Sequence, residues 1–496
     1  MEQTCLKYVP SAINAIDFYK SSHASQYPVG TTEVYSNFTP RNTKHLNVEK
    51  ELYDGKIVFF GLQALIKTFL IDNFSSTFFN VPKDIAIKRL KRRFDTSLFT
   101  DYDMSRIESL HDLGYLPIRI KALPEGVKVN PGIPVFTVVN TLPQFFWLTN
   151  YLETALSAEI WKKMVNATIA SHYRGILVKF AEETGAPKEF CAWQGHDFSA
   201  RGLTGIADQY LNGMAHLTSF YGTDTVLAID AMEDLYNADA DKEIIGGSVP
   251  ATEHSVMTMD GVQGEKELIR RIIQDVHPAG IVSVVSDSFD FWKTITVYAS
   301  ELKDVILARE GKVVFRPDSG DPVKIICGDR DAEVGSNEWK GAVVCLAEIF
   351  GTTTNDKGYE TLNGKVGLIY GDSITPRRAN QILQNLKEMG YASDNIVFGI
   401  GSYTYAYSTR DSIGGAMKAT SGVVNGERRA IFKAPKTDSA KKSARGLLRV
   451  EIQNGEYILL DDQTEEQEAQ GELKVVFENG VLLKETSLAE IRARLM

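Results

Sequence analysis

The chain has 496 residues, of which 43% are hydrophobic and 24% charged, as in an ordinary globular protein with room for two or three domains. The formal net charge of -10 disfavours nucleic acid as the main partner. The sequence has no apolar run near the roughly 18 residues of a membrane span, no signal-peptide core and no zinc spacing among its four cysteines, so we expect a cytoplasmic protein.

The first 185 residues predict a mixed α and β region. Residues 34–41 are typical of a strand that ends in a basic residue, and residues 61–70 and 82–94 have the apolar spacing of helices. Proline and glycine break the stretch from residue 118 to 139 into short expected strands. The apolar pattern from residue 142 to about 183 predicts two long helices that meet near Asn166 and Ala167.

A different pattern begins after about residue 187. Short apolar strands end in polar, glycine-rich segments, and helical patterns follow them. The clearest strands are 281–285, 366–370 and 396–398, and residues 312–315 predict a further short strand. The clearest helices are 265–276 and the segment from Thr375-Pro376 to Gly390. This repetition predicts parallel strands with helical crossovers. Seven such units favour a barrel over an open sheet, although spacing alone leaves both open.

The repetition ends near residue 411. We expect strands at 423–432 and 447–460, and a short amphipathic helix within residues 480–496 that packs back on the N-terminal half. The predicted fold is therefore α/β. Residues 186–411 form an irregular β/α barrel that carries most of the active site, and residues 1–185 with 412–496 form a discontinuous α+β domain.

The polar segments after the predicted strands carry the candidate chemistry. They are QGHDFSARG (194–202), YGTDT (221–225), GGSVPATEHS (246–255), SDSFD (286–290), RPDSGDP (316–322), YGDSIT (370–375) and GIGSYTY (399–405). In α/β folds ligands bind at the carboxyl ends of strands. The segments supply carboxylates for hydroxyls and magnesium, arginines for an anion, an aromatic ring and glycine-rich turns, which suit a phosphorylated sugar.

Each of these residues also has a purely structural interpretation. RPDSGDP is good turn chemistry, and the two interpretations of it are about equal. Phe198 could fill the core, Asp224 could cap the following helix, and His254 could be a buried histidine. The segments contain neither a nucleophile elbow nor HExxH, and they have no GxGxxG that opens a helix.

Taken together, the motifs resemble the nicotinamide phosphoribosyltransferases, which are type II phosphoribosyltransferases. The matching motifs include AIDFYKSSH, FFGLQ, LPIRIKALPEG, FWLTNYLET, HDFSARG, GTDTV, GGSVPATEHS, VSVVSDSFD, RPDSGDP, GDSIT and STRD. The resemblance implies transfer of the phosphoribosyl group of 5-phosphoribosyl-1-pyrophosphate to nicotinamide in NAD salvage. It also implies Mg²⁺ bound mainly through phosphates, ATP hydrolysis through a phosphohistidine, and a homodimer with shared active sites; nucleic acid and membranes are not expected partners.

The resemblance assigns roles to matching positions. The nicotinamide ring would stack between Phe198 and Tyr19 of the partner subunit, Asp224 and Arg316 would hold its amide, and Asp17 would orient it. Arg201 and Ser248 would complete the nicotinamide site. The resemblance also implies that His254, Asp287 and Asp318 act in catalysis. The residues that would bind the ribose and the 5′-phosphate are Asp318, Gly371, Asp372, Gly401 and Ser402. The residues that would bind pyrophosphate and ATP are Arg41, Arg410, Lys418, Lys433, Lys441 and Lys442.

Three alternatives stay open at this point. A nicotinate phosphoribosyltransferase of the same fold would need to tolerate Asp224, whose carboxylate accepts a hydrogen bond from an amide but repels nicotinate. A non-catalytic nucleotide-binding protein would not need the intact set Arg316, Asp318, Asp372 and His254. A sugar-phosphate isomerase on a similar barrel would need a base near a carbonyl and gives no reason for an aromatic clamp.

Overall fold

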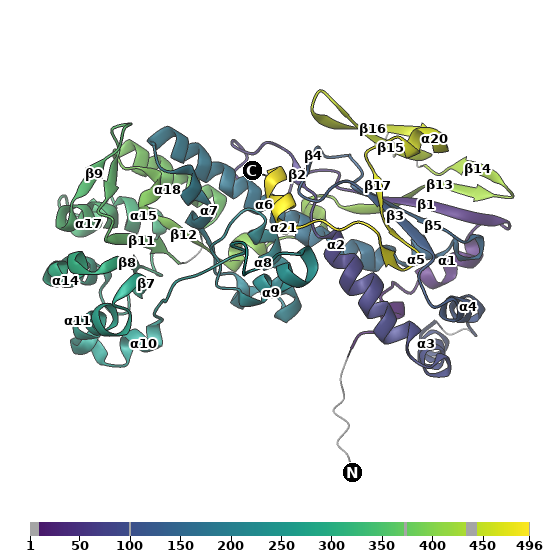
Figure 1. Ribbon diagram of the computed structural model, residues 1–496, viewed down its shortest axis with the longest axis horizontal. Coiled ribbons are helices and arrows are strands. Elements are labelled where there is room, and N and C mark those ends of the chain that lie inside the picture. Colours follow the sequence, from purple (N-terminus) through teal and green to yellow (C-terminus); the bar gives the residue numbers. More distant parts are fainter. Residues whose placement is uncertain (1–8, 99–100, 372–373, 433–443, 496) are drawn as a thin grey trace, which may run out of the picture.

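The computed structural model describes residues 9–98, 101–371, 374–432 and 444–495. Two lobes, each built on one large sheet, lie side by side along the long axis of the molecule (Figure 1). None of the described helices combines the length and the apolar character that crossing a membrane requires. The predicted domain boundaries stay a prediction.

One lobe contains an antiparallel sheet of seven strands. Its inner strand β1 (Thr31–Thr39) pairs with β13 (Ala416–Val424) on one side and with β5 (Phe136–Asn140) on the other. The pair Asn37 and Lys418 joins positions 381 residues apart, so both ends of the chain build this sheet. Its other strands are β3 (Ile118–Ala122), β14 (Glu427–Ala430), β17 (Lys474–Glu478) and β18 (Val481–Leu482).

The predictions of single strands at residues 423–432 and 447–460 are wrong, because each region forms a hairpin of two strands. β13 and β14 are joined at Asn425-Gly426, and β15 (Leu447–Gln453) and β16 (Glu456–Gln463) are joined at Asn454-Gly455. Both asparagines have positive φ, 53° and 52°, which asparagine and glycine tolerate and tight hairpin turns require. The Asn-Gly pairs were therefore the sequence signal for these turns.

The other lobe contains a parallel sheet with the order β6-β12-β11-β8-β7. Isolated parallel bridges continue the pairing beyond β6, from Asp197 to Thr223 and from Gly222 to Gly247, and a further bridge joins Ala251 to Ser283 of β7. The sheet is therefore curled, and the predicted strands near 281, 312, 366 and 396 are confirmed. The strands are β6 (Gly195–Asp197), β7 (Ala279–Val285), β8 (Glu310–Arg316), β11 (Val366–Tyr370) and β12 (Val397–Ile400).

Helices cover both lobes (Figure 1). In the antiparallel lobe they include α1 (Lys20–Gln26), α2 (Leu62–Leu65), α3 (Lys83–Leu98), α4 (Ser105–Leu113) and α5 (Leu148–Tyr151). In the parallel lobe they include α8 (Gly205–Leu217), α9 (Val226–Tyr236), α10 (His254–Thr258), α11 (Gly261–Arg271), α15 (Pro322–Cys327), α17 (Ala342–Phe350), α18 (Pro376–Glu388) and α19 (Ser402–Tyr405). The predicted cap of α18 is confirmed, because the Thr375 side chain accepts from the backbone N–H of Arg378.

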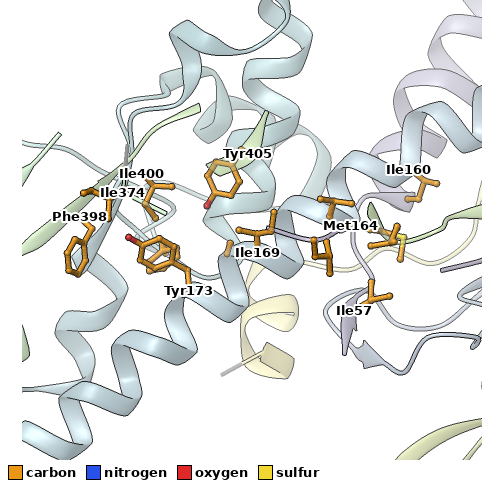
Figure 2. Packing of buried hydrophobic residues seen from close by; sticks show 14 of the residues in the cluster. Ile57, Ile160, Met164, Ile169, Tyr173, Ile374, Phe398, Ile400 and Tyr405 are labelled. Carbon is orange, nitrogen blue, oxygen red and sulfur yellow. The ribbon is translucent and has the colours of Figure 1, made fainter. Parts of the chain in front are cut away.

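A single helix, α6 (Glu153–Thr184), connects the two lobes. Its 32 residues make it about 48 Å long. In its first half Ile160 and Met164 pack toward Ile57, and farther along Tyr173 lies against Phe398 with ring centroids 6.3 Å apart (Figure 2). One continuous helix thereby packs against residues of both lobes.

The prediction of two helices that meet at Asn166 is wrong. Asn166 is fully buried inside α6, and its amide donates to Asn212 Oδ1 at 2.5 Å. An asparagine breaks a helix by bonding its own neighbouring backbone. Here the side chain is engaged by α8 instead, so the helix continues.

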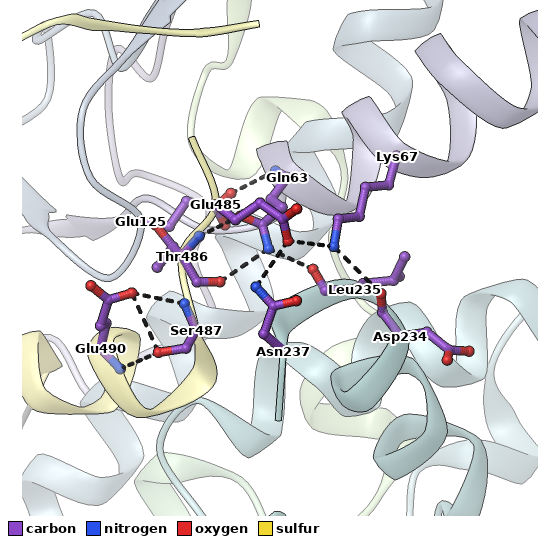
Figure 3. Close-up of polar contacts among 10 residues, drawn as sticks. All are labelled: Gln63, Lys67, Glu125, Asp234, Leu235, Asn237, Glu485, Thr486, Ser487 and Glu490. Atoms are coloured by element: carbon purple, nitrogen blue, oxygen red, sulfur yellow. Dashed lines mark hydrogen bonds and ion pairs between the residues drawn. The ribbon is translucent and has the colours of Figure 1, made fainter. Parts of the chain in front are cut away.

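The C-terminal segment returns to the centre of the molecule (Figure 1), where its polar contacts gather around Gln63 (Figure 3). Gln63 exchanges hydrogen bonds with the backbone of Thr486, at 2.6 Å and 3.0 Å, and also donates to Leu235 O at 2.5 Å. Ser487 and Glu490 then cap the terminal helix α21 (Leu488–Leu495). The predicted C-terminal helix is confirmed.

Candidate active site

The carboxyl ends of the parallel strands surround one end of a cavity of about 610 Å³. Lys312, Val314 and Arg316 of β8 all line it, as alternate residues on one face of a strand do. Four residue steps span about 13 Å, so the cavity extends along most of β8. Residues at the end near Arg316 are His196, Phe198, Asp224 and Ser248, and residues farther along include Trp193, Ile281, Thr361 and Asp394.

Asp224 is held in place by two side chains. Its Oδ1 lies 2.8 Å from His196 Nε2 and accepts a hydrogen bond from Ser248 Oγ at 2.5 Å. Burial pushes the pKa of Asp224 upward, but the hydrogen bonds from His196 and Ser248 and the charge of Arg316 lower it below its usual value. The group is therefore a carboxylate at neutral pH, and it faces the cavity.

Phe198 and Arg316 complete this end of the cavity. The guanidinium carbon of Arg316 lies 5.9 Å from the centre of the Phe198 ring, and the ring of His196 packs against Phe198 at 4.7 Å. Within the described residues, the buried Nε of Arg316 has no hydrogen-bond partner. A flat ligand on Phe198 could therefore be met by a carboxylate on one side and by a free donor on another.

A second group of polar side chains lies after β7 and β8. Asp287 Oδ2 accepts hydrogen bonds from the Asp318 backbone N–H at 2.9 Å and from Ser319 Oγ at 2.6 Å. Its other oxygen, Oδ1, lies 3.3 Å from Nε2 of the half-exposed His254. This Oδ1 is buried and has no hydrogen-bond partner in the described part of the chain, so it can bind a proton or a cation.

The turn after β11 brings the backbone close to Asp318. A Cβ on Gly371 would lie 2.5 Å from Asp318 Oδ1, and a Cβ on Gly399 would lie 2.6 Å from the Phe198 ring. Glycine at both positions therefore permits this packing. Gly401 and Ser402 follow β12 and start α19. Asp372 lies outside the described residues.

Among the described residues, no three of histidine, cysteine, aspartate and glutamate gather as a metal site would require. Carboxylates are nevertheless present after β7 and β8, at Asp287 and Asp318. The unpartnered Oδ1 of Asp287 fits a Mg²⁺ ion that takes most of its other ligands from a bound phosphate.

The remaining predicted residues fall into two groups. Arg201 lies on the turn after β6 in the parallel lobe, and its side chain is exposed. The others belong to elements of the antiparallel lobe or flank them: Asp17 and Tyr19 precede α1, Arg41 follows β1, Arg410 precedes β13, and Lys418 lies in β13. Tyr19 is 57% exposed. Asp17 accepts from Thr154 Oγ1 at 2.8 Å, and Arg41 donates to Gly414 O at 2.7 Å. Lys433, Lys441 and Lys442 lie outside the described residues.

His196 is the site residue that the sequence predictions missed. It lies two positions before Phe198, so strand alternation places both side chains on the cavity face. The sequence motif QGHDFSARG contains His196, but only the contact of His196 with Asp224 in the structure indicates that His196 belongs to the site. That contact joins positions 28 residues apart and has no local signature.

Comparisons with known proteins agree with this geometry. Residues 193–481 match the model of the nicotinate phosphoribosyltransferase (NAPRTase) family, and residues 11–120 match the N-terminal domain of nicotinamide phosphoribosyltransferase. A nicotinamide phosphoribosyltransferase of Acinetobacter baylyi is 55% identical over 97% of this chain and 96% of its own. One of Xanthomonas campestris pv. campestris is 33% identical over 98% of both chains.

The fold has relatives among solved structures as well. The crystal structure of a nicotinate-nucleotide pyrophosphorylase from Pyrococcus furiosus covers 100% of this chain and 97% of its own, with a TM-score of 0.59 and 15% identity. That likeness concerns the mixed α/β fold with its curled parallel sheet. The family model and the full-length relatives decide the rest: the chain belongs to the NAPRTase family and, within it, to the nicotinamide phosphoribosyltransferases.

Proposed function

We propose that the protein transfers the phosphoribosyl group of 5-phosphoribosyl-1-pyrophosphate to nicotinamide and so forms nicotinamide mononucleotide and pyrophosphate in NAD salvage. The observation that carries this proposal is the carboxylate of Asp224, which His196 and Ser248 hold beside Phe198 in the cavity. The full-length relatives bear the same activity in their names. The seven strand segments are proposed to form an irregular barrel of the type II kind.

The cavity residues account for the choice of base. The nicotinamide ring stacks on Phe198, its amide N–H donates to Asp224, and its amide oxygen accepts from Arg316. Stacking of two aromatic rings contributes about 0.5–1.5 kcal/mol, so the polar pair must supply the orientation. A nicotinate carboxylate would face Asp224 as a like charge, which disfavours the nicotinate alternative.

The transfer needs positioning more than acid–base catalysis. The ring nitrogen donates its lone pair to C1 of the ribose while the bond from C1 to the pyrophosphate oxygen breaks, and the electron pair of that bond leaves with pyrophosphate. Asp318 and Gly371, with Asp372, hold the ribose hydroxyls, and Gly401 and Ser402 hold the 5′-phosphate. Fixing both reactants in line supplies most of the rate enhancement.

Magnesium is part of the proposal. Asp287 and Asp318 are the residues that would hold it, together with phosphate oxygens. When bound, the ion neutralises the charge that develops on the leaving pyrophosphate. Arg41, Arg410 and Lys418, with Lys433, would bind the same pyrophosphate, and Lys441 and Lys442 would cover ATP.

ATP is proposed to act through His254. Nε2 of His254 faces Asp287 at 3.3 Å, which leaves Nδ1 to attack the γ-phosphorus of ATP. The bond between that phosphorus and the bridging oxygen breaks, ADP leaves, and a phosphorus–nitrogen bond forms. Water later hydrolyses the phosphohistidine. Asp287 orients the ring in this step and stabilises its positive charge.

Tyr19 and Asp17 are proposed to act in a second copy of the chain. Tyr19 is exposed on the antiparallel lobe, whereas Phe198 lines the cavity of the parallel lobe. A homodimer in which Tyr19 of the partner subunit covers the open face of Phe198 would complete the nicotinamide site.

The decisive experiment is a product assay. The protein is mixed with 5-phosphoribosyl-1-pyrophosphate and Mg²⁺, with nicotinamide or nicotinate, and with or without ATP. We expect nicotinamide mononucleotide to form, nicotinate to be a poor substrate, and ATP to raise the yield. Preferred use of nicotinate would establish the alternative activity, and failure with both bases would leave a binding protein.

A further inference from the structure

Arg492 of the C-terminal helix α21 is almost completely buried, with 6% of its surface exposed. Its guanidinium donates to four backbone carbonyls. Nε bonds to Leu217 O at 2.9 Å, Nη1 to Ile244 O at 2.7 Å, and Nη2 to Ile245 O at 2.5 Å and to Phe220 O at 3.3 Å. The guanidinium also lies 4.5 Å from the centre of the Tyr221 ring. One side chain therefore joins two segments, 217–221 and 244–245.

These two segments lead directly into the site. Asp224 follows Tyr221 by three residues, and Ser248 follows Ile245 by three, so each is about 10 Å of extended chain away. Between them the segments pair, because Gly247 N–H donates to Tyr221 O at 2.8 Å and Thr223 N–H donates to Gly247 O at 3.0 Å. The pairing ends at the 2.5 Å hydrogen bond from Ser248 to Asp224.

Little else could satisfy three of these four carbonyls. Leu217 and Phe220 are fully buried and Ile245 is 2% exposed, so water does not replace the guanidinium there, whereas Ile244 is 56% exposed. A guanidinium presents five donors in a planar fork, whereas a lysine has three donors on one nitrogen and cannot reach both segments in the same way. Burial lowers the pKa of Arg492 to about 10, which leaves it charged at neutral pH.

The helix that carries Arg492 is itself fixed. Thr486, next to its cap, exchanges hydrogen bonds with Gln63, and Ser487 and Glu490 cap its first turn (Figure 3). The turn at Gly126 has φ +89°, and a Cβ there would lie 2.8 Å from Ile491 O. The end of the chain thus presents the guanidinium from a rigid support.

We propose that Arg492 is a positioning residue for base selection, which acts by setting the distance between the segments that carry Asp224 and Ser248. This rests on the proposed function of Asp224. If the two segments move apart, Ser248 loses its hydrogen bond to Asp224, and the carboxylate no longer faces the amide of the base at the right distance. Selectivity for nicotinamide would then fall without loss of the phosphoribosyl-binding residues.

Arg309 provides a matched control. It is 5% exposed and donates to the carbonyls of residues 273, 277, 279, 280 and 312 at the opposite, amino-terminal ends of β7 and β8. Arg309→Lys removes the same chemistry from a position remote from Asp224. Both variants should lower the melting temperature, so stability alone does not distinguish them.

The experiment measures Arg492→Lys, Arg309→Lys and the wild type with nicotinamide and nicotinate. We expect Arg492→Lys to raise KM for nicotinamide by about tenfold while kcat falls by less than about threefold, because misplacement weakens binding of the base. The preference of the Arg492→Lys variant for nicotinamide over nicotinate should fall as well. Arg309→Lys should keep the KM and the preference of the wild type.

Hydrogen exchange gives a second readout that needs no turnover. Amides of residues 221–225 and 246–249 should exchange faster in Arg492→Lys, and amides of residues 279–283 should exchange faster in Arg309→Lys. An unchanged KM, preference and exchange in Arg492→Lys would overturn the proposal. A wild type that makes no mononucleotide would refute the proposed function, and the exchange comparison would still decide whether Arg492 holds the two segments.

Discussion

At the scale of single residues, substrate choice depends on the few atoms around Asp224. His196 and Ser248 both contact the same carboxylate oxygen, at 2.8 Å and 2.5 Å. This leaves Oδ2 as the natural acceptor for a ligand amide. The histidine comes from strand β6 and the serine from the loop after Gly247, so two parts of the chain cooperate to keep one carboxylate charged and oriented.

Replacing Asp224 with alanine should change the preferred base. We expect kcat/KM for nicotinamide to fall about 100-fold, because a site built for an amide hydrogen bond loses its partner, and we expect nicotinate turnover to become measurable. Steady-state kinetics with both bases check this. Ser248→Ala is the matched control: it keeps the carboxylate and should cost about tenfold at most while nicotinamide stays preferred. Unchanged kinetics in Asp224→Ala would contradict the assignment.

The pH dependence of nicotinamide binding tests the same carboxylate. The pKa of Asp224 is lowered from 3.8, so the binding form is the charged one and is lost only when the pH falls through that lower value. The dissociation constant for nicotinamide should therefore stay constant from pH 8 down to about 5. Calorimetric titration across this range measures it, and binding that weakens within the range would contradict the prediction.

Replacing His254 with alanine should separate basal synthesis from ATP stimulation. His254 is half exposed and contacts Asp287, which is not among the residues of the proposed nicotinamide site. We expect the variant to make mononucleotide at the basal rate and to gain nothing from added ATP. Product yield and ADP release, measured with and without ATP, check this. If the variant is still stimulated, His254 is not the phosphorylated group.

At the scale of elements, Glu125 holds several segments together at the centre of the molecule (Figure 3). Its carboxylate accepts hydrogen bonds from the backbone N–H of Gly61 at 2.5 Å, from that of Gln63 at 2.6 Å, and from Tyr236 OH at 2.9 Å. The two donating N–H groups lie at the start of α2, and the donating hydroxyl lies at the end of α9. Glu125 therefore links the antiparallel lobe to the helix that begins beside Asp224.

Glu125→Gln should destabilise the protein. A glutamine side chain has one acceptor oxygen, so one of the two buried backbone N–H groups would lose its partner. We expect the free energy of unfolding to fall by about 1–3 kcal/mol. Denaturant unfolding followed by far-ultraviolet circular dichroism measures it. Glu490→Gln, on exposed surface, is a suitable control, and a variant at residue 125 as stable as that control would contradict the prediction.

At the scale of the whole molecule, the candidate site is divided between lobes. Phe198 and Asp224 line the cavity of the parallel lobe, whereas Asp17 and Tyr19 lie on the antiparallel lobe, across a helix about 48 Å long. Helix α6 fixes the distance between the two groups within one chain. A second copy is the proposed means of bringing them together.

Mixing two impaired variants tests this sharing of sites. Tyr19→Ala and Phe198→Ala should each lower kcat/KM about tenfold by removing one side of the stack. In dimers formed by mixing both chains, half of the dimers are hybrids with one intact site, so about a quarter of all sites should regain full activity. The control pairs Phe198→Ala with Asp224→Ala, which should regain nothing because both changes fall in the same lobe. Equal results for the two mixtures would refute the shared site.

The chemistry at strand ends was predictable because it is local. A run of apolar residues that leads into RPDSGDP or YGTDT places Arg316 at the end of a strand and Asp224 directly after the bridged residues 222 and 223. The strands at 281–285 and 366–370 and the cap at Thr375 were equally visible, since two-residue alternation and capping depend on near neighbours. The family resemblance followed from the order of these motifs.

Contacts between residues far apart in sequence were decided only by the tertiary structure. The continuity of α6 depends on Asn212, the charge of Asp224 on His196, and the clamp of Arg492 on carbonyls about 250 residues earlier. Periodicity and turn chemistry report which way a side chain points, but they carry no distance between segments. The sequence by itself therefore determined which groups could act, and the packing of the two lobes determined which of them meet.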